Sequence, residues 1–485
     1  MTALHETILR HRDSDAPAVD LGRAGSLSYR AFFERVDAVS ARLSDMPEGA
    51  SAGILSSRTW VAYATVIACF LSGRCFVPLN PDFPPERLAK IVRQGGVALI
   101  AHDPAHAEVA RRLSEDTLDV ADAGSAPAPA HAYTPPAPDA IAYQMFTSGS
   151  TGDPKGVPIR YSSLAHYVAE VRKTVGLTEP GRYSQVFDLS FDLAMHDIFV
   201  ALANGGTLVP AGKMDLMMPH SYIQKKQIDH WFSVPMLGLS AARGIEGGTV
   251  SHRLRSALFC GEPLPYGYVR DFSAFVADGV RVWNLYGPTE ATIAFTAKPV
   301  DTVGQDDTVV PLGTPFGQNR IAIEDETGVH TALSDGIKGE LLLGGPQVFE
   351  GYNPPVNPDS FTPTDPVYYR SGDLVKYERG ELHHLGRKDS QIKIRGYRVE
   401  LGDIEVALRK TFNIRAIAVV LVGSGETSMI AAAYEADQDI DDTAPLNDHL
   451  PVYMIPQAWK RFDALPVNVN GKIDRRALRE MDWRG

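Results

Sequence analysis

The sequence predicts an α/β protein with a large N-terminal lobe and a small C-terminal lobe, and three observations support this prediction. The chain has 485 residues, which is too long for one ordinary hydrophobic core, so we expect two or three lobes. Hydrophobic residues make up 44% of the chain and charged residues 22%, as in well-packed globular proteins. Within residues 1–120, apolar runs of strand length alternate with helical patterns, which indicates a largely parallel sheet covered by helices.

The first helices and strands follow from the spacing of apolar residues. Residues 27–43 carry Tyr29, Phe32 and Val36 at helical spacing, so we expect an amphipathic helix there. The same arguments predict strands at 53–55, 75–78 and 97–101 and helices at 60–71 and 86–93.

The remaining chain divides where the composition changes. Residues 124–138 are rich in proline and alanine and are typical of a surface crossing. A second α/β stretch extends from there to about residue 313, and strand patterns with frequent turns at 320–384 predict a small β subdomain. The C-terminal part is predicted to be a separate α+β lobe, with a helix at 400–412, strands at 416–422 and 429–436, and a helical, then basic tail from Pro445.

Charge and cysteine content exclude several classes of protein. The net charge is −12, whereas a nucleic-acid-binding protein would carry a basic surface. Cys69, Cys75 and Cys260 stand in apolar surroundings, which favours free thiols in a reducing cytoplasm. The charged N-terminus is unlike a secretory signal, and the longest apolar run, residues 60–71, is shorter than the roughly 20 residues that span a membrane. We therefore expect a cytoplasmic protein with no nucleic acid and no membrane as a partner.

A glycine- and hydroxyl-rich segment, residues 146–156, follows an apolar strand and reads FTSGSTGDPKG. Small residues let the backbone approach an anion closely, N–H and hydroxyl groups can surround phosphate oxygens, and Lys155 adds positive charge. The residue order of a Walker loop is absent. The segment therefore predicts a different kind of phosphate-binding loop, in preference to a flexible surface loop.

This loop resembles the signature loop of the AMP-forming adenylate-forming enzymes, which include acyl- and aryl-CoA synthetases, luciferases and the amino-acid adenylation domains of nonribosomal peptide synthetases. Four further segments resemble motifs of that family in the same order: 284–290 (NLYGPTE), 369–373 (YRSGD), 386–400 (GRKDSQIKIRGYRVE) and 468–474 (NVNGKID). The resemblance implies a large lobe over residues 1–387, a small mobile α+β lobe over residues 388–485 and an active site between them that uses ATP and Mg²⁺.

The resemblance also implies roles for individual residues. Tyr286 would pack on adenine, Asp373 would bind both ribose hydroxyls, and Glu290 would hold magnesium. Lys472 would bridge the substrate carboxylate and the α-phosphate as the main catalytic residue, together with Lys155 and Glu290, and Asp389 would be the hinge of the small lobe. The implied ATP-binding residues are Thr147, Ser148, Gly149, Ser150, Thr151, Gly152, Lys155, Gly261, Glu262, Asn284, Tyr286, Gly287, Thr289, Asp373 and Arg387.

Residues 190–199 (SFDLAMHDIF) resemble the substrate-binding segment of amino-acid adenylation domains. There an aspartate at the position of Asp192 pairs with the α-ammonium group, since a buried charge needs a partner; the alternative is an aspartate that caps a helix. Asp197 is expected to cap or pair locally. The implied substrate-binding residues are Asp192, Leu193, His196, Phe232, Leu258, Cys260, Leu285, Ile293, Ala294 and Lys472.

The implied pocket is apolar apart from Asp192 and His196, so we expect a small or compact apolar side chain on the substrate. The set resembles proline-specific sets, and sets for alanine, serine and cysteine share several of its positions. His196 is either a hydrogen-bonded core histidine or a reader of a polar group.

The resemblance implies that the protein activates an amino acid with ATP and passes it to the phosphopantetheine thiol of a separate peptidyl carrier protein, as in antibiotic biosynthesis. No carrier-type motif follows Lys472. Two alternatives stay open. Asp192 argues against an acyl- or aryl-CoA ligase, and the presence of Lys155, Glu290 and Lys472 argues against an inactive nucleotide-binding partner protein.

Overall fold

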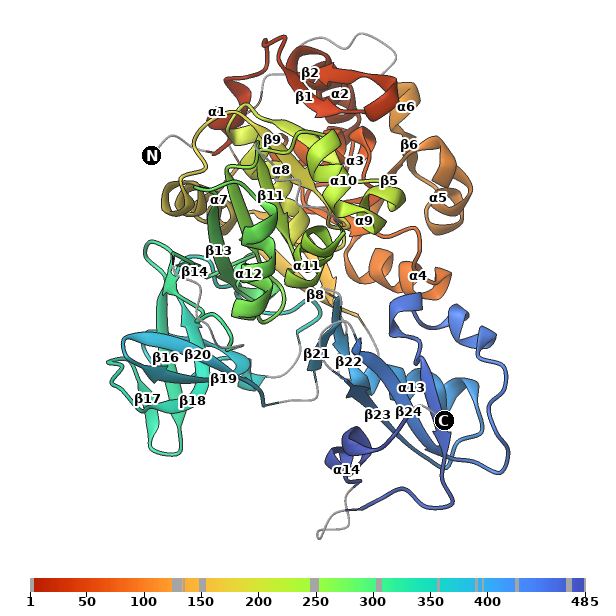
Figure 1. Cartoon of the computed structure of the whole chain (residues 1–485). Helices are drawn as coiled ribbons and strands as arrows, with labels where there is room; N and C mark the ends of the chain where they lie inside the picture. Colours follow the sequence, from red (N-terminus) through yellow and green to blue (C-terminus); the bar gives the residue numbers. More distant parts are fainter. Residues whose placement is uncertain are drawn as a thin grey trace. The chain divides into compact units, whose positions relative to one another are not determined.

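The structure is a computed structural model, and its contacts divide the chain into two compact units (Figure 1). It describes residues 4–123, 133, 136–147, 154–244, 253–301, 308–355, 358–388, 391–394, 397–423, 427–467 and 473–483. Unit 1 comprises Met1–Pro81, Val92–Met145 and Gly156–Lys388, and unit 2 comprises Asp82–Ile91, Phe146–Lys155 and Asp389–Gly485.

A six-stranded sheet contains most of the strands predicted in the N-terminal part. Its strand order is β6-β5-β3-β4-β7-β8, and the pairs β6–β5, β5–β3, β3–β4 and β4–β7 are parallel. Every residue of β3 is buried, as expected for a parallel strand that is covered on both faces. The strands are β3 (Ser51–Leu55), β4 (Phe76–Leu79), β5 (Val97–His102), β6 (Thr117–Asp119), β7 (Ile141–Thr147) and β8 (Lys155–Arg160). The helices in this part of the chain are α1 (Leu4–Leu9), α2 (Tyr29–Leu43), α3 (Trp60–Leu71), α4 (Pro85–Gln94), α5 (Ala107–Leu113) and α6 (Val120–Ala123).

The helix predicted at 27–43 begins two residues later than expected. Leu27 belongs to β2 (Ser26–Ser28), where it pairs with Val19 of β1 (Pro17–Asp20). Ser28 ends that strand and caps α2, because its hydroxyl accepts a hydrogen bond from the backbone N–H of Ala31 at 3.2 Å.

A nine-stranded sheet forms the centre of unit 1. Its order is β15-β14-β13-β12-β11-β9-β10-β1-β2, with parallel pairing from β13 to β1 and antiparallel strands at both ends. All 11 residues of α8 (Leu193–Ala203) are buried, which fits a helix that is apolar apart from His196 and Asp197. The other strands are β9 (Arg182–Gln185), β10 (Thr207–Pro210), β11 (His230–Ser233), β12 (Ser256–Phe259), β13 (Arg281–Tyr286), β14 (Thr296–Pro299) and β15 (Thr314–Pro315). The other helices are α7 (Tyr161–Val175), α9 (Lys213–Met217), α10 (Pro219–Lys225), α11 (Pro235–Arg243) and α12 (Tyr266–Phe275).

The predicted β subdomain is a five-stranded antiparallel sheet of order β17-β16-β18-β19-β20. Its strands are β16 (Arg320–Asp325), β17 (Gly328–His330), β18 (Lys338–Gly344), β19 (Tyr369–Glu378) and β20 (Glu381–Arg387). Residues from Leu4 to Leu382 share one hydrophobic core, so this sheet is packed into unit 1.

Unit 2 contains a three-stranded sheet with an apolar cluster on each face. Along β23 (Ala416–Val422), Ile417 and Val419 join one cluster with α13 (Leu401–Thr411), while Ala418 and Val420 join the other with α14 (Arg475–Glu480). The sheet continues with β24 (Met429–Glu435) and β25 (Ala458–Arg461), and β21 (Gln391–Ile394) and β22 (Tyr397–Glu400) form a separate hairpin. The prediction of a helical tail from Pro445 is wrong for β25, which pairs in parallel with β24.

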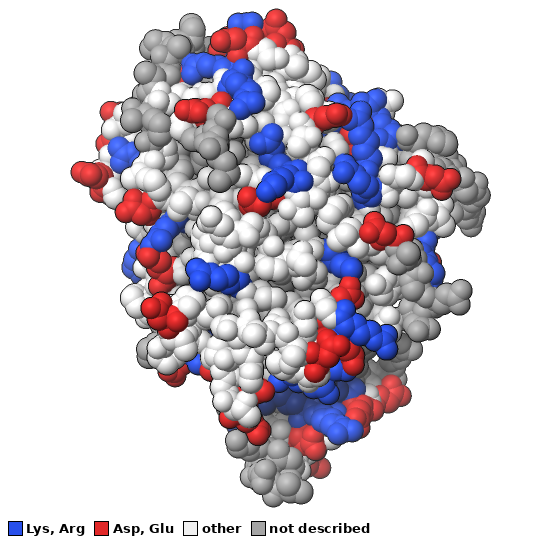
Figure 2. All heavy atoms as spheres, turned by 90° about the vertical axis from the view of Figure 1, so that its left-hand side faces the viewer, with Lys and Arg blue, Asp and Glu red and all other residues white. Residues whose placement is uncertain are grey.

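None of the helices in the described part of the chain combines the length and apolar character that a membrane span requires. Figure 2 shows one face of the molecule, on which Lys and Arg side chains lie interspersed with Asp and Glu.

Candidate active site

The carboxylate of Asp192 lies at the start of α8 but does not cap this helix. Asp192 occupies the N-cap position and is 7% exposed, yet its side chain makes no cap hydrogen bond. Its Oδ2 atom accepts a hydrogen bond from the backbone N–H of Ile293 at 3.3 Å, more than 100 residues along the chain. The alternative interpretation, an aspartate that caps the helix, is therefore wrong. The carboxylate is directed instead toward the loop after η3 (Thr289–Ala291).

The loop that contacts Asp192 has a strained backbone. Thr292 and Ile293 have φ angles of 58° and 70°, a left-handed conformation that costs a β-branched residue about 1–3 kcal/mol. The fully buried Gln347 holds it, since its Nε2 lies 3.2, 3.2 and 2.7 Å from the carbonyl oxygens of Ala291, Thr292 and Ala294. Sequence analysis missed Gln347, which fixes the backbone of two predicted pocket residues.

The predicted apolar wall residues come together on one face of the nine-stranded sheet. Phe232 of β11 is in register with Leu258 of β12, and Leu285 of β13 lies on the same face because side chains alternate along a strand. At Gly261, φ is 97° and a Cβ atom would lie 3.5 Å from Leu193. Leu193, the sheet face and the 292–294 loop therefore belong to one region of unit 1.

His196 is a neutral, hydrogen-bonded core histidine. It is 3% exposed, and burial, assisted by His230, lowers its pKa to about 3. Its Nδ1 lies 2.7 Å from the hydroxyl of Tyr167 in α7, and its ring centroid lies 4.2 Å from that of Phe232. Tyr167 was not predicted from the sequence. The structure thus favours the core interpretation of His196 and removes it as a counter-charge for an acidic substrate.

Asp197, the next residue of α8, makes no local pair or cap among the described residues. It is 1% exposed and neither carboxyl oxygen has a hydrogen-bond partner there. Burial raises the pKa of this carboxyl well above its ordinary value, and the nearby backbone N–H of Val186 offsets only part of the shift. The expectation that Asp197 caps or pairs locally is therefore wrong.

Asp197→Asn should stabilise the protein, and the gain should grow as pH rises above about 4. The carboxyl of the unfolded chain ionises near its ordinary pKa of 3.8, whereas the folded form keeps its proton to higher pH. Between the pKa of the unfolded chain and the higher pKa of the folded protein, the stability of the wild type therefore falls as pH rises, by at most about 1.4 kcal/mol per pH unit. The asparagine variant cannot ionise at this position, so its stability shows no such fall. Thermal unfolding of both proteins at pH 5 and pH 7 measures the difference.

Asp229→Asn is the matched control, because Asp229 is equally buried but lies 3.0 Å from Arg253 and accepts the Arg182 backbone N–H. This control should lower the melting temperature at pH 7. An Asp197→Asn gain that is the same at both pH values would contradict the assignment of a buried carboxyl with a raised pKa.

The predicted ribose-binding residue Asp373 belongs to a tight polar cluster in unit 1. The Tyr286 hydroxyl donates to its Oδ2 at 2.5 Å, and Arg387 Nη1 donates to its Oδ1 at 3.0 Å. Burial and the Asp373 charge raise the pKa of Tyr286 well above its ordinary value, so the phenol remains a donor. The structure thus brings Tyr286, Asp373 and Arg387 together from β13, β19 and β20.

Two other predicted residues of the nucleotide site are held by the protein itself. The fully buried Glu290 accepts a hydrogen bond from the Tyr352 hydroxyl at 2.7 Å. The amide of Asn284 donates to the carbonyl oxygens of Val310 and Pro311, which ties β13 to the segment that precedes β15. At Gly287 a Cβ atom would lie 2.7 Å from the Ala294 Cα, so only glycine fits here.

The predicted phosphate loop and catalytic lysine fall mainly outside the described residues. These are Ser148, Gly149, Ser150, Thr151, Gly152, Asp389 and Lys472. Thr147 ends β7, and its hydroxyl is buried without a hydrogen-bond partner among the described residues, as expected where a ligand would complete the bonding. Lys155 begins β8, Glu262 follows Gly261 after β12, and Thr289 begins η3.

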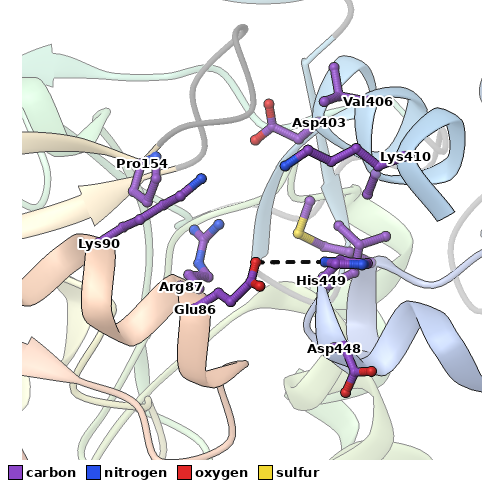
Figure 3. Close-up of a pocket in the computed structure, with 12 residues that line it drawn as sticks. Glu86, Arg87, Lys90, Pro154, Asp403, Val406, Lys410, Asp448 and His449 are labelled. Carbon is purple, nitrogen blue, oxygen red and sulfur yellow. Dashed lines mark ion pairs between the residues drawn. The ribbon is translucent and has the colours of Figure 1, made fainter. Parts of the chain in front are cut away.

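Unit 2 contains a separate pocket lined by residues of both charges (Figure 3). Glu86 and Lys90 of α4 lie on one side and Asp403 and Lys410 of α13 on the other, and Glu86 lies 3.9 Å from His449. None of the predicted site residues lines this pocket.

Known proteins resemble this chain over most of its length. The family model of AMP-binding enzymes matches residues 6–353. The L-proline--[L-prolyl-carrier protein] ligase of Pseudomonas fluorescens is 32% identical over 93% of this chain and 94% of its own length. Phosphinothricin tripeptide synthetase PhsC of Streptomyces viridochromogenes is also 32% identical, over 98% of this chain and 44% of its own length. This chain thus spans less than half of that relative, as it does of several other curated relatives.

The solved structures agree with this relationship. The Vibrio cholerae adenylation domain AlmE, in complex with glycyl-adenosine-5'-phosphate, has a TM-score of 0.86 and 27% sequence identity, and the match covers 98% of this chain and 96% of AlmE. The predicted α/β fold class and the resemblance carried by the sequence motifs are both confirmed. This chain belongs to the AMP-binding enzyme family.

Proposed function

We propose that this protein activates a compact α-amino acid with ATP, releases pyrophosphate, and transfers the aminoacyl group to the phosphopantetheine thiol of a separate carrier protein. The observation that carries the proposal is the carboxylate of Asp192, which is buried and accepts the backbone N–H of Ile293. A carboxylate in such a place suits the α-ammonium group of an amino acid. The relatives support the class of substrate, because one is named as a prolyl-carrier protein ligase and another holds glycyl-AMP.

L-Proline is the first candidate substrate. Phe232, Leu258 and Leu285 present an apolar surface, and the neutral His196 supplies no charge. A cationic or acidic side chain would therefore meet no counter-charge at these positions. Alanine, serine and cysteine are the alternatives of similar size.

The activation step is attack of the amino acid carboxylate on the α-phosphorus of ATP, which forms a carboxyl–phosphate bond and expels pyrophosphate. Asp373 and Tyr286 would orient the nucleoside, and Thr147 and Lys155 would contact its phosphates. Lys472 would stabilise the charge that builds up as the two anions meet. In the second step the carrier thiol attacks the acyl carbon and AMP leaves.

Magnesium fits the donor set around Glu290. This carboxylate is fully buried beside the neutral phenol of Tyr352, and hard oxygen donors suit Mg²⁺. The described residues contain no cluster of three or more His, Cys, Asp or Glu side chains that could hold a metal, so most ligands would come from phosphate oxygens and water. Bound Mg²⁺ would neutralise the phosphate charge.

ATP–pyrophosphate exchange tests the proposal, with L- and D-amino acids, fatty acids and aromatic acids offered separately. We expect exchange with L-proline or another compact amino acid, followed by loading of a phosphopantetheinylated carrier protein but not of coenzyme A. Exchange with fatty or aromatic acids alone would indicate a CoA ligase. ATP binding without exchange on any acid would indicate an inactive nucleotide-binding protein.

A further inference from the structure

A second imidazole lies beside the predicted ribose-binding carboxylate. Nε2 of His384 lies 3.4 Å from Oδ1 of Asp373, the oxygen that also accepts from Arg387 Nη1 at 3.0 Å. An ionised carboxylate only accepts hydrogen bonds, so His384 must carry its proton on Nε2 here. Tyr286 of β13 donates to Oδ2, so side chains from β13 and β20 together hold both oxygens of Asp373.

An irregularity in the sheet places His384 in this position. β19 and β20 pair with Asp373 opposite Arg387 and Leu374 opposite Gly386, and then the register shifts so that Val375 lies opposite His384. Leu385 is the extra residue and is 55% exposed. Without the shift, Leu385 would face Val375, and His384 would lie on the other face of the sheet, because successive side chains alternate. The bulge therefore directs His384 to the face that carries Asp373 and Arg387.

Two glycines and a serine hydroxyl support the backbone around this bulge. Gly372 and Gly386, on either side of the Asp373–Arg387 pair, have φ angles of 75° and 128°, which favour glycine. Ser371 adds support from the same strand, since its hydroxyl accepts the Asp373 backbone N–H at 3.1 Å. Asp373 itself is 5% exposed, so its carboxylate is held in a defined orientation before any ligand arrives.

We propose that His384 is a positioning residue for nucleotide recognition, which holds the Asp373 carboxylate in the orientation that recognises the ribose hydroxyls. This inference rests on the proposed function, because that proposal places ATP at Asp373. His384 acts through Asp373 and has no part in the chemical step. Loss of His384 therefore weakens the binding of nucleotides that carry both ribose hydroxyls and leaves deoxynucleotides less affected.

The test is calorimetric titration of the full chain with ATP, 2′-deoxy-ATP and 3′-deoxy-ATP. Wild-type protein should prefer ATP over both deoxynucleotides. His384→Leu should weaken ATP binding about 5-fold and reduce that preference by a similar factor, as expected for one hydrogen bond. His384→Gln should restore part of the preference, because its amide N–H can donate to the carboxylate. In pyrophosphate exchange, KM for ATP should rise in His384→Leu while kcat stays unchanged.

His383→Leu is the matched control, since His383 lies next in β20 on the opposite face and in register with Lys376. It should leave all three nucleotide affinities unchanged. The inference is overturned if His384→Leu keeps the wild-type preference for ATP, or if His383→Leu lowers it equally. A wild-type protein that binds ATP and 2′-deoxy-ATP equally would overturn the placement of ribose at Asp373, and one that binds no nucleotide would overturn the proposed function as well.

Discussion

Lys472→Ala should lower the rate of aminoacyl-adenylate formation by about 100- to 1,000-fold while ATP binding changes little. The ammonium group is proposed to lie between the substrate carboxylate and the α-phosphate, where two anions must approach each other. Its charge stabilises the transition state more than the bound nucleotide, so its loss affects kcat more than affinity. Amino-acid-dependent pyrophosphate exchange and calorimetric ATP binding measure the two quantities.

Lys460→Ala is the control for this substitution, because Lys460 is an exposed lysine in the same C-terminal region. Its exchange rate should match that of the wild type. Exchange that survives Lys472→Ala intact would show that the lysine does not take part in adenylation, even if the rest of the proposed site is correct.

Asp192→Asn should raise KM for the amino acid by about 100-fold or more, with KM for ATP nearly unchanged. The asparagine keeps the shape of the side chain and can still accept the Ile293 N–H, but it removes the negative charge that would face the α-ammonium group. Loss of one partner leaves the other charge buried and uncompensated, which accounts for the size of the effect. Exchange kinetics at varied amino acid and ATP concentrations separate the two constants.

Asp197→Asn serves here as the matched control, because it makes the same chemical change five residues along the chain, in the buried helix α8. It should leave KM for the amino acid unaltered, since burial raises the pKa of Asp197 and its carboxyl has no place in the proposed substrate site. An unaltered KM in Asp192→Asn would remove the basis for an amino acid as substrate.

Local sequence patterns predicted the elements that depend on neighbouring residues. The helix at 60–71 is α3, and the apolar spacing of 86–93 and 416–422 gave α4 and β23 within a residue of their observed ends. β25 could not be predicted in this way. It has four residues, two of them charged, and is a strand because it pairs with β24, which precedes it by more than 20 residues.

The candidate site shows the same division. Asp192 and Tyr286 lie in segments that resemble family motifs, so both residues could be predicted from the sequence directly. Gln347, Tyr167 and His384 act through partners that only the fold brings near: Gln347 lies 53 to 56 residues from the carbonyl groups it contacts. No short pattern in the sequence distinguishes such a glutamine from a surface one, and the register shift that directs His384 depends on the pairing of two strands.

The left-handed conformation of Thr292 and Ile293 has a consequence for attempts to change the substrate of this enzyme. Wall positions of the proposed pocket on the sheet, such as Phe232 or Leu258, have ordinary strand backbones, so exchanging their buried side chains changes the pocket volume and the core packing but not the backbone conformation. At Ile293 each exchange also changes the energy of the left-handed backbone conformation. Asparagine or glycine there would lower the backbone strain, and valine would not. A library that randomises Ile293 would thus vary backbone strain, core packing and selectivity together, whereas one restricted to the sheet positions would vary packing and selectivity without the backbone strain.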